Sequence, residues 1–268
     1  MIHKVRLKSR DVNVELDGDF YGSEFWDKIS NRRYEPDTIG FLEDRCDNQT
    51  DFMDIGAANG AMTLIAANEG SRVSSYEPDP RIHRAVLQNV RLNSVLGQQI
   101  LVQNKAISVD KGILEFKKDG DSSILSSIVF TGYDASNSIY IDVLSLSDEV
   151  ARFHIDKSRK LIIKMDIEGA EWRILKSRKI LDALSANAAT LLLAVHPGFY
   201  RPFVPKLRGL DKFRLVLWKL RNYQESVETF ELLSEYASIQ RTNLNPIINK
   251  RQFAMLILAG YHEFIVEF

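Results

Sequence analysis

The chain has 268 residues, 45% of them hydrophobic and 26% charged, which is ordinary for one sizeable globular domain with a well-buried core. Its 35 basic and 36 acidic residues leave a formal net charge of -1, so no overall field favours nucleic acid or an anionic membrane. The single cysteine, Cys46, excludes an intramolecular disulfide and a zinc site made of cysteines alone. Because neither a signal-peptide block nor a membrane-spanning apolar stretch is found, we expect a cytoplasmic protein.

Residues 1–45 are predicted to form an N-terminal flap. Apolar and polar residues alternate up to about Asp19, which indicates one or two short strands. An aromatic segment, residues 20–26, and a helix that includes Phe41 follow. Two interpretations remain open: the flap packs onto a sheet, or it closes over a ligand and excludes water from it.

The stretch from Asp51 to Gly60 is the most informative part of the N-terminal half. An apolar strand ends at Asp54, and a turn of small residues leads into an alanine-rich helix that ends near Gly70. Such a strand-turn-helix unit opens nucleotide-binding α/β sheets. Gly56 and Gly60 would let the backbone come close to a ligand, and the first N–H groups of the helix would point at it.

The glycine spacing in this turn separates two classes of cofactor. Gly56 and Gly60 follow the pattern G-x-x-x-G with Asp54 just ahead, whereas the dinucleotide fingerprint is G-x-G-x-x-G. A carboxylate at this place repels a pyrophosphate and suits a cation. S-adenosylmethionine (SAM) carries an ammonium and a sulfonium group, so the turn favours SAM over NAD. The alternative is a strand-to-helix turn without a ligand.

Strands and helices then alternate, as in a doubly wound parallel sheet. Residues 72–76 form the predicted second strand, and Glu77 follows it, where an acid reaches the ribose hydroxyls of a nucleotide cofactor. Asp79 is a good N-cap for a helix that Gly97 closes. Asn104 comes after a third strand, where its amide would meet the adenine or serve only the loop.

Residues 108–143 differ in character from the segments around them. They contain a turn at Lys111-Gly112, a stretch rich in serine, glycine and aspartate, and two short apolar runs. This pattern indicates an antiparallel excursion, a set of short strands inserted between the two halves of the sheet. A helix from Ser145 to about His154 follows.

The next apolar strand contains a lysine and ends in a group of acids. Lys164, Asp166 and Glu168 alternate, so in an extended chain they share one face. A lysine inside such a strand needs a partner, because burial of a lone charge is unfavourable, and Asp166 is the near candidate. Ligands of open α/β sheets bind at the carboxyl ends of strands. The alternative is an ion pair that caps the strand and starts a helix.

His196 ends the following strand, which we place at residues 190–195. A histidine titrates near neutrality and suits general-base chemistry on a hydroxyl, although a lone histidine is also a common structural residue. Residues 199–225 are basic and aromatic, which fits either a solvated amphipathic helix or a lid for an anionic or glycosidic acceptor. Binding of nucleic acid is disfavoured because the chain as a whole is not basic. For residues 226–268 we expect a helix and a β-hairpin about Gly260.

Three motifs together resemble the FkbM-like family of SAM-dependent methyltransferases. They are Asp54-Ile55-Gly56-Ala57-Ala58-Asn59-Gly60, then Glu77-Pro78, then Lys164-Met165-Asp166-Ile167-Glu168-Gly169-Ala170-Glu171. The first two are shared by many SAM enzymes, whereas the third is far more specific, and all three agree in order and spacing. The resemblance covers roughly Tyr34 to His196, and the basic-aromatic segment is not matched by it.

The resemblance implies a single class I methyltransferase domain over residues 1–268, with a cofactor-binding core at residues 46–198. The fold would be α/β: a doubly wound, mostly parallel seven-stranded sheet with one antiparallel strand near the C-terminal end. The implied contacts to SAM are Gly56, Asn59 and Gly60 for the methionine part, with Asp54 nearby, Glu77 for the ribose, and Asp166 and Glu168 at the methyl-transfer face. The family is associated with O-methylation of sugars and natural products.

The sequence therefore predicts a SAM-dependent O-methyltransferase for a hydroxyl of a sugar, a glycoconjugate or a natural product. We expect His196 to act as the base, with Lys164 or Asp166 as the alternative. No bound metal is expected, and a divalent cation held by Asp166, Glu168 and His196 is kept as an alternative. A catalytically inactive SAM-binding interaction module is the alternative function, and an NAD-dependent oxidoreductase is disfavoured by the glycine spacing.

Overall fold

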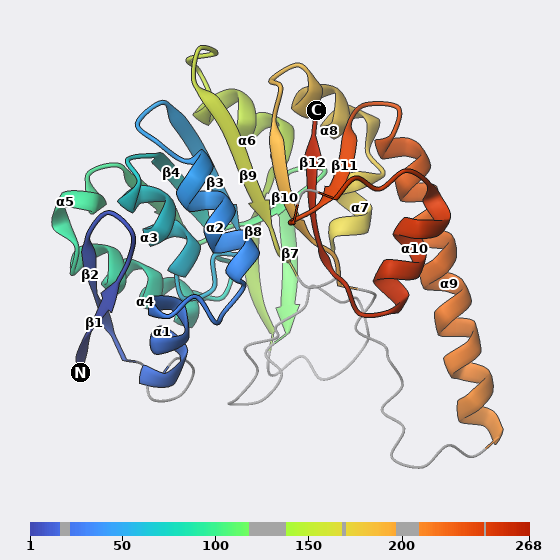
Figure 1. The fold of residues 1–268 in the computed structure, drawn as a ribbon, viewed down its shortest axis with the longest axis horizontal. Coiled ribbons are helices and arrows are strands. Elements are labelled where there is room, and N and C mark those ends of the chain that lie inside the picture. Colours follow the sequence, from blue (N-terminus) through green and yellow to red (C-terminus); the bar gives the residue numbers. More distant parts are fainter. Residues whose placement is uncertain (17–21, 118–137, 168–169, 197–208, 244) are drawn as a thin grey trace.

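The computed structural model describes residues 1–16, 22–117, 138–167, 170–196, 209–243 and 245–268, and its main feature is a seven-stranded sheet (Figure 1). In spatial order the strands are β11 (Ser238–Arg241), β12 (Glu263–Glu267), β10 (Thr190–Ala194), β9 (Lys160–Met165), β3 (Thr50–Ile55), β4 (Arg72–Tyr76) and β5 (Ile100–Gln103). The strands from β10 to β5 run parallel to one another, and β12 is antiparallel to both β10 and β11. The doubly wound, mostly parallel seven-stranded sheet expected from the sequence is confirmed.

The central strands are buried on both faces, which explains their apolar composition. All of β3 is buried, and β9 is buried except at its first residue. Because successive side chains of a strand point to opposite faces, alternate residues fill two different cores. Phe52 and Ile162 belong to one core, and Met53 and Ile163 belong to the other.

Helices cover both faces of the sheet. The core that contains Phe52 is completed by α1 (Ser23–Ser30), α2 (Pro36–Arg45), α3 (Ala61–Asn68) and α5 (Ser94–Gly97). The opposite core is completed by α6 (Leu146–Phe153), α7 (Glu171–Leu175), α8 (Arg178–Ser185), α9 (Gly209–Leu233) and α10 (Lys250–Leu258). Helix α4 (Pro80–Arg91) contacts β5, and the Asp79 side chain caps it as predicted, by accepting from the backbone N–H of Arg81. The helix ends at Arg91, and Gly97 instead ends the separate α5.

Residues 1–45 pack onto this body. Strands β1 (Ile2–Arg6) and β2 (Asp11–Glu15) form an antiparallel hairpin whose valines are buried. Trp26 of α1 is also buried and shares a core cluster with Phe52 of the sheet. The packing interpretation of the flap is thus observed, and its closure over a ligand stays a prediction.

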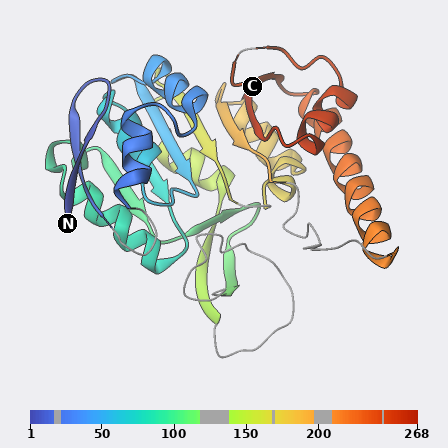
Figure 2. The same ribbon diagram turned by 60° about the horizontal axis from the view of Figure 1, so that its bottom comes forward.

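The chain leaves the main sheet after β5. Strands β6 (Ala106–Ser108), β7 (Gly112–Lys117) and β8 (Ser138–Ser145) form a separate sheet, in which β7 and β8 are antiparallel and β6 and β8 are parallel. The β7–β8 pair projects from the body of the molecule (Figure 2). The predicted antiparallel excursion is confirmed in this pair, and residues 118–137 lie outside the described part of the chain.

The C-terminal segment differs from the prediction. Instead of a hairpin about Gly260, the structure has helix α10 before this glycine and the single strand β12 after it. The hairpin prediction is wrong because the apolar residues follow a helical period, and Phe253 and Ile257, one turn apart, are buried together. The side chain of Asn249 also caps α10, since its oxygen accepts the backbone N–H of Gln252 at 2.9 Å.

Helix α9 occupies most of the segment for which a lid and a separate helix are predicted. The helix predicted to begin at residue 226 is the last part of α9, which ends at Leu233 before β11 begins. Residues 199–208, the first part of the basic-aromatic segment, lie outside the described residues. The lid interpretation therefore stays a prediction.

Candidate functional site

The turn after β3 touches the end of β9. Gly56 has a φ of 83°, and a Cβ built on it would lie 1.9 Å from the backbone oxygen of Asp166. Gly60 has a φ of 81°, and its Cβ would lie 3.0 Å from the side chain of Val86. Both glycines thus have a conformation that other residues rarely adopt. Gly56 is required first of all because two backbone segments meet there, which the sequence alone does not reveal.

Asp54, at the end of β3, is buried and incompletely hydrogen-bonded. Its Oδ2 accepts a hydrogen bond from the Thr63 hydroxyl at 2.6 Å, whereas its Oδ1 has no hydrogen bond. Burial raises the pKa of this carboxyl, although the nearby Lys164 opposes the shift. Asp54 and Lys164 are directly paired between β3 and β9, so the two predicted residues lie side by side.

Glu77 follows β4 and reaches back to the same turn. Its Oε2 accepts the backbone N–H of Ala58 at 3.0 Å, and its Oε1 accepts that of Asp79 at 2.8 Å. Burial raises the pKa of Glu77 to about 8 against these two donors. Asn104 donates to the backbone oxygens of Glu77 and Pro78, both at 2.9 Å. The acid and the amide predicted for the cofactor are therefore joined to the glycine turn.

Asn59 holds the start of helix α3. Its side-chain oxygen accepts the backbone N–H of Ala61 at 3.1 Å, and its backbone oxygen accepts the amide of Asn89 at 3.0 Å. The side-chain nitrogen of Asn59 is buried without a hydrogen bond. An unsatisfied buried polar group costs about 1–3 kcal/mol, so this nitrogen is a candidate ligand contact.

Lys164 and Asp166 form the ion pair predicted for the end of β9, with Nζ 3.1 Å from Oδ2. Burial by itself would lower the pKa of Lys164, but the carboxylates of Asp166, Glu35 and Asp54 outweigh it and raise this pKa. Burial would likewise raise the pKa of Asp166, yet Lys164 and His196 lower it overall. At neutral pH the pair is therefore a charged lysine and a charged aspartate.

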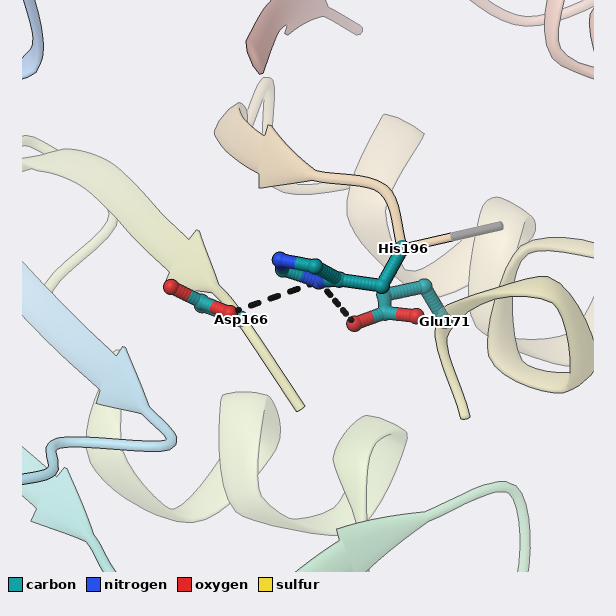
Figure 3. A group of neighbouring side chains, drawn as sticks. All are labelled: Asp166, Glu171 and His196. Carbon is teal, nitrogen blue, oxygen red and sulfur yellow. Dashed lines mark hydrogen bonds and ion pairs between the residues drawn. The ribbon is translucent and has the colours of Figure 1, made fainter. Parts of the chain in front are cut away.

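His196, two residues after the end of β10, lies between two carboxylates (Figure 3). Its Nδ1 is 3.6 Å from Oδ1 of Asp166 and 3.5 Å from Oε1 of Glu171. Glu171 begins α7 and is fully buried, and its Oε1 also accepts the backbone N–H of Ile167 at 3.0 Å. Glu168, the other acid predicted for this place, lies outside the described residues.

The sequence analysis missed several residues of this region. Glu171 is part of the third motif but is not among the predicted site residues. His262 stacks on His196, with ring centroids 6.0 Å apart, because β12 runs back along β10. Tyr34 and Glu35, just before α2, interact electrostatically with Lys164, and Glu35 has a left-handed φ of 37°. Only the polar character of these residues could have pointed to them, since long-range packing brings them here.

The fold and this arrangement together define a class of protein. Three features are those of a SAM-dependent methyltransferase. The sheet is doubly wound with one antiparallel strand, a glycine turn follows the first strand of its parallel part, and an acid follows the next strand. Residues 54–203, more than half of the chain, match the methyltransferase FkbM domain. The chain belongs to this family, so the predicted family, enzyme class and cofactor SAM are confirmed.

Several solved methyltransferase structures are similar to the chain. A TehB-like SAM-dependent methyltransferase from Corynebacterium glutamicum is 10% identical, with 91% of this chain and 92% of that one covered and a TM-score of 0.38. Geranyl diphosphate C-methyltransferase from Streptomyces coelicolor is 10% identical, with 93% and 83% covered and a TM-score of 0.39. Precorrin-6y C5,15-methyltransferase from Geobacter metallireducens is 11% identical, with 77% and 72% covered and a TM-score of 0.34. The search of curated proteins found no match.

Among the described residues, no helix is both long and apolar enough to cross a membrane.

Proposed function

We propose that the chain transfers the methyl group of SAM to a hydroxyl of a sugar, a glycoconjugate or a natural product. The observation that carries the proposal is the place of His196. It lies two residues after the end of β10, which pairs with β9, and its Nδ1 is 3.6 Å from Oδ1 of Asp166, whose backbone touches the glycine turn. A hydroxyl acceptor must lose a proton as it attacks, and a histidine at this edge supplies a base of suitable strength.

The proposed SAM site lies along the turn between β3 and α3. Asp54, Gly56, Asn59 and Gly60 would hold the methionine part, and Glu77 would hold the ribose. Two observations support this assignment: Oδ1 of Asp54 and the side-chain nitrogen of Asn59 are buried without hydrogen bonds. Ligand groups of opposite character, an ammonium for the carboxylate and a carboxylate for the amide, would satisfy both.

Glu77 and Asn104 occupy the neighbouring part of the proposed cofactor site. Each oxygen of the Glu77 carboxylate accepts one backbone N–H and keeps a lone pair for a ribose hydroxyl. Asn104 holds the backbone of residues 77–78 in place. We propose Asn104 as the neighbour of the adenine, although its described contacts are those of a loop amide.

The reaction is an in-line displacement. The acceptor oxygen attacks the methyl carbon, the carbon–sulfur bond breaks, and sulfur keeps the electron pair as S-adenosylhomocysteine forms. In the proposal His196 takes the hydroxyl proton. Lys164 is less suited, because its raised pKa keeps it protonated, and Asp166 is a weak base because its pKa is lowered. We therefore assign to Lys164 the role of orienting Asp166.

A methyl-transfer assay with labelled SAM and a panel of sugars, glycosides and hydroxylated natural products tests the function. We expect S-adenosylhomocysteine together with a base-stable methyl ether on the acceptor. If calorimetry shows SAM binding while no hydroxyl compound is methylated, the chain is instead the inactive SAM-binding module considered as the alternative. The cytoplasmic location and the single-domain organisation expected from the sequence stay predictions.

A further inference from the structure

Three potential metal ligands from different segments converge at the carboxyl edge of the sheet. Asp166 follows β9, Glu171 begins α7 and His196 follows β10, and one ligand atom of each lies within 4.8 Å of the others (Figure 3). The measured spacings from Nδ1 of His196 are 3.6 Å to Oδ1 of Asp166 and 3.5 Å to Oε1 of Glu171. Donors about 2.1 Å from a cation lie about 3.0 Å apart in an octahedron and about 3.4 Å apart in a tetrahedron. The two spacings that involve His196 are therefore close to those between ligands of one cation.

The two carboxylates are held in place by contacts outside the group of three. Lys164 binds Oδ2 of Asp166 at 3.1 Å and leaves Oδ1 facing His196. The backbone N–H of Ile167 fixes Glu171, whose side chain is fully buried. Such outer contacts are what orient the ligands in metal sites.

Oδ1 of Asp166 provides a second, independent observation. It is buried and has no hydrogen bond, although it faces the imidazole of His196. A cluster built only for stability would give such an atom a hydrogen-bond donor, because a buried carboxylate oxygen without a hydrogen bond is unfavourable. A cation between the three side chains would satisfy it.

We propose that Asp166, Glu171 and His196 bind one divalent cation. Two carboxylate oxygens and an imidazole nitrogen suit a first-row transition metal such as Mn²⁺ better than Mg²⁺, which prefers oxygen ligands alone. The site uses Glu171 and does not require Glu168, the acid considered for this role from the sequence. His196 would bind through Nδ1 as the neutral imidazole, with its proton on Nε2.

The cation deepens the proposed function and rests on it for its chemical role. It would accept a lone pair of the acceptor oxygen and make the hydroxyl proton more acidic, so that the proton passes to water as the oxygen attacks the methyl group. His196 then serves as a ligand in place of a base.

Titration of the full-length, chelator-treated protein with Mn²⁺, followed by the electron paramagnetic resonance signal of free Mn²⁺, tests the site without any acceptor. We expect one equivalent to bind, and Glu171→Gln and His196→Gln to weaken this binding by at least about tenfold. Glu171→Gln keeps an oxygen that can accept the N–H of Ile167, and its thermal unfolding checks that it folds. Glu228→Gln, on the exposed face of α9 in an ion pair with Lys176, is the matched control and should bind as the unmodified chain does.

Binding that is absent, or equal in all variants, overturns the cation site. The methyl-transfer assay, run on the same samples with and without Mn²⁺, separates this result from the function. Transfer to a hydroxyl that persists in excess chelator rejects the cation and leaves His196 as the base. If one equivalent of Mn²⁺ binds tightly but no hydroxyl is methylated, the cation site is supported and the O-methyltransferase function is rejected.

Discussion

The two ends of strand β3 each carry a buried aspartate, and the two differ in how they are satisfied. Asp51, near the amino end, accepts hydrogen bonds from Arg72 at 2.7 and 3.1 Å, from Arg159 at 2.6 Å and from His154 at 2.9 Å. Asp54, near the carboxyl end, accepts one from Thr63 and keeps an oxygen without a hydrogen bond.

The pKa shifts of the two carboxyls have opposite signs. Burial would raise the pKa of Asp51, but hydrogen bonds from Arg72, His154 and Arg159 outweigh it and lower the pKa. At Asp54 burial prevails and the pKa is raised. Residue type and strand are the same, and the two carboxyls differ in their hydrogen-bond partners and in how strongly burial acts on their pKa values. The partners at the amino end stabilise the fold, whereas the proposed SAM site lies at the carboxyl end, where Asp54 keeps a buried oxygen without a hydrogen bond.

The largest effect on the free energy of unfolding is expected from a change at the amino end of β3. Asp51→Ala should lower the free energy of unfolding by about 3–5 kcal/mol, because it leaves the buried His154 and the guanidinium groups of Arg72 and Arg159 without their shared carboxylate. Denaturant unfolding measures the change. Asp54→Asn is the matched comparison, and it should keep most of the stability while weakening SAM binding. Equal destabilisation by both variants would remove the contrast between the two ends.

The next effect concerns catalysis at the carboxyl end. His196→Ala should lower turnover by about 100-fold or more, either as the lost base or as a lost cation ligand, while the dissociation constant for SAM stays unchanged. Steady-state kinetics and calorimetry on the same preparation measure both quantities. Full activity in this variant would exclude His196 from the reaction.

Glu77→Ala should weaken SAM binding by about 1.5–3 kcal/mol through the loss of its hydrogen bonds to the ribose. Calorimetric titration with S-adenosylhomocysteine measures the change. The variant also removes the acceptor for the N–H groups of Ala58 and Asp79, so its thermal unfolding is measured to check that the turn is not loosened. An unchanged affinity in Glu77→Ala would reject the ribose assignment.

The smallest expected effect is on the pH dependence of stability. Glu77 has a pKa of about 8 in the folded chain against 4.5 as its ordinary value, so between these pH values the folded state holds a proton that the unfolded state has released. The free energy of unfolding should therefore fall as pH rises from about 4.5 to 8.

Glu77→Gln should flatten this slope, and denaturant unfolding at several pH values measures it. Asp51 acts in the opposite sense, because its lowered pKa contributes stability that is lost only as pH falls below about 3.8. A slope that is the same with and without Glu77 would show that its carboxyl is ionised in the folded chain.

The sequence predicted the parts of the fold that depend on local pattern. The strand that ends at Asp54, the acid Glu77 after the second strand and the pair of Lys164 with Asp166 all follow from alternation, spacing and the need of a buried lysine for a partner. These signals lie within a few residues of one another. They were sufficient for the family and the doubly wound sheet.

What the sequence did not reveal depends on contacts between distant segments. His262 reaches His196 only because β12 runs antiparallel to β10, and the segment before it was interpreted as a strand although it forms α10. The role of Gly56 was assigned to a ligand, whereas its missing Cβ first makes room for Asp166. Neither the contact of His262 with His196 nor that of Gly56 with Asp166 produces a local periodicity in the sequence.

The contact between Gly56 and Asp166 has a mechanical consequence. The backbone beneath the proposed methyl donor and the backbone that presents Asp166 to the acceptor are in direct steric contact, so neither can be displaced without pushing the other. In the proposed site, donor and acceptor would thereby rest on two segments of main chain in contact, and this contact would help to set the distance that the methyl group travels.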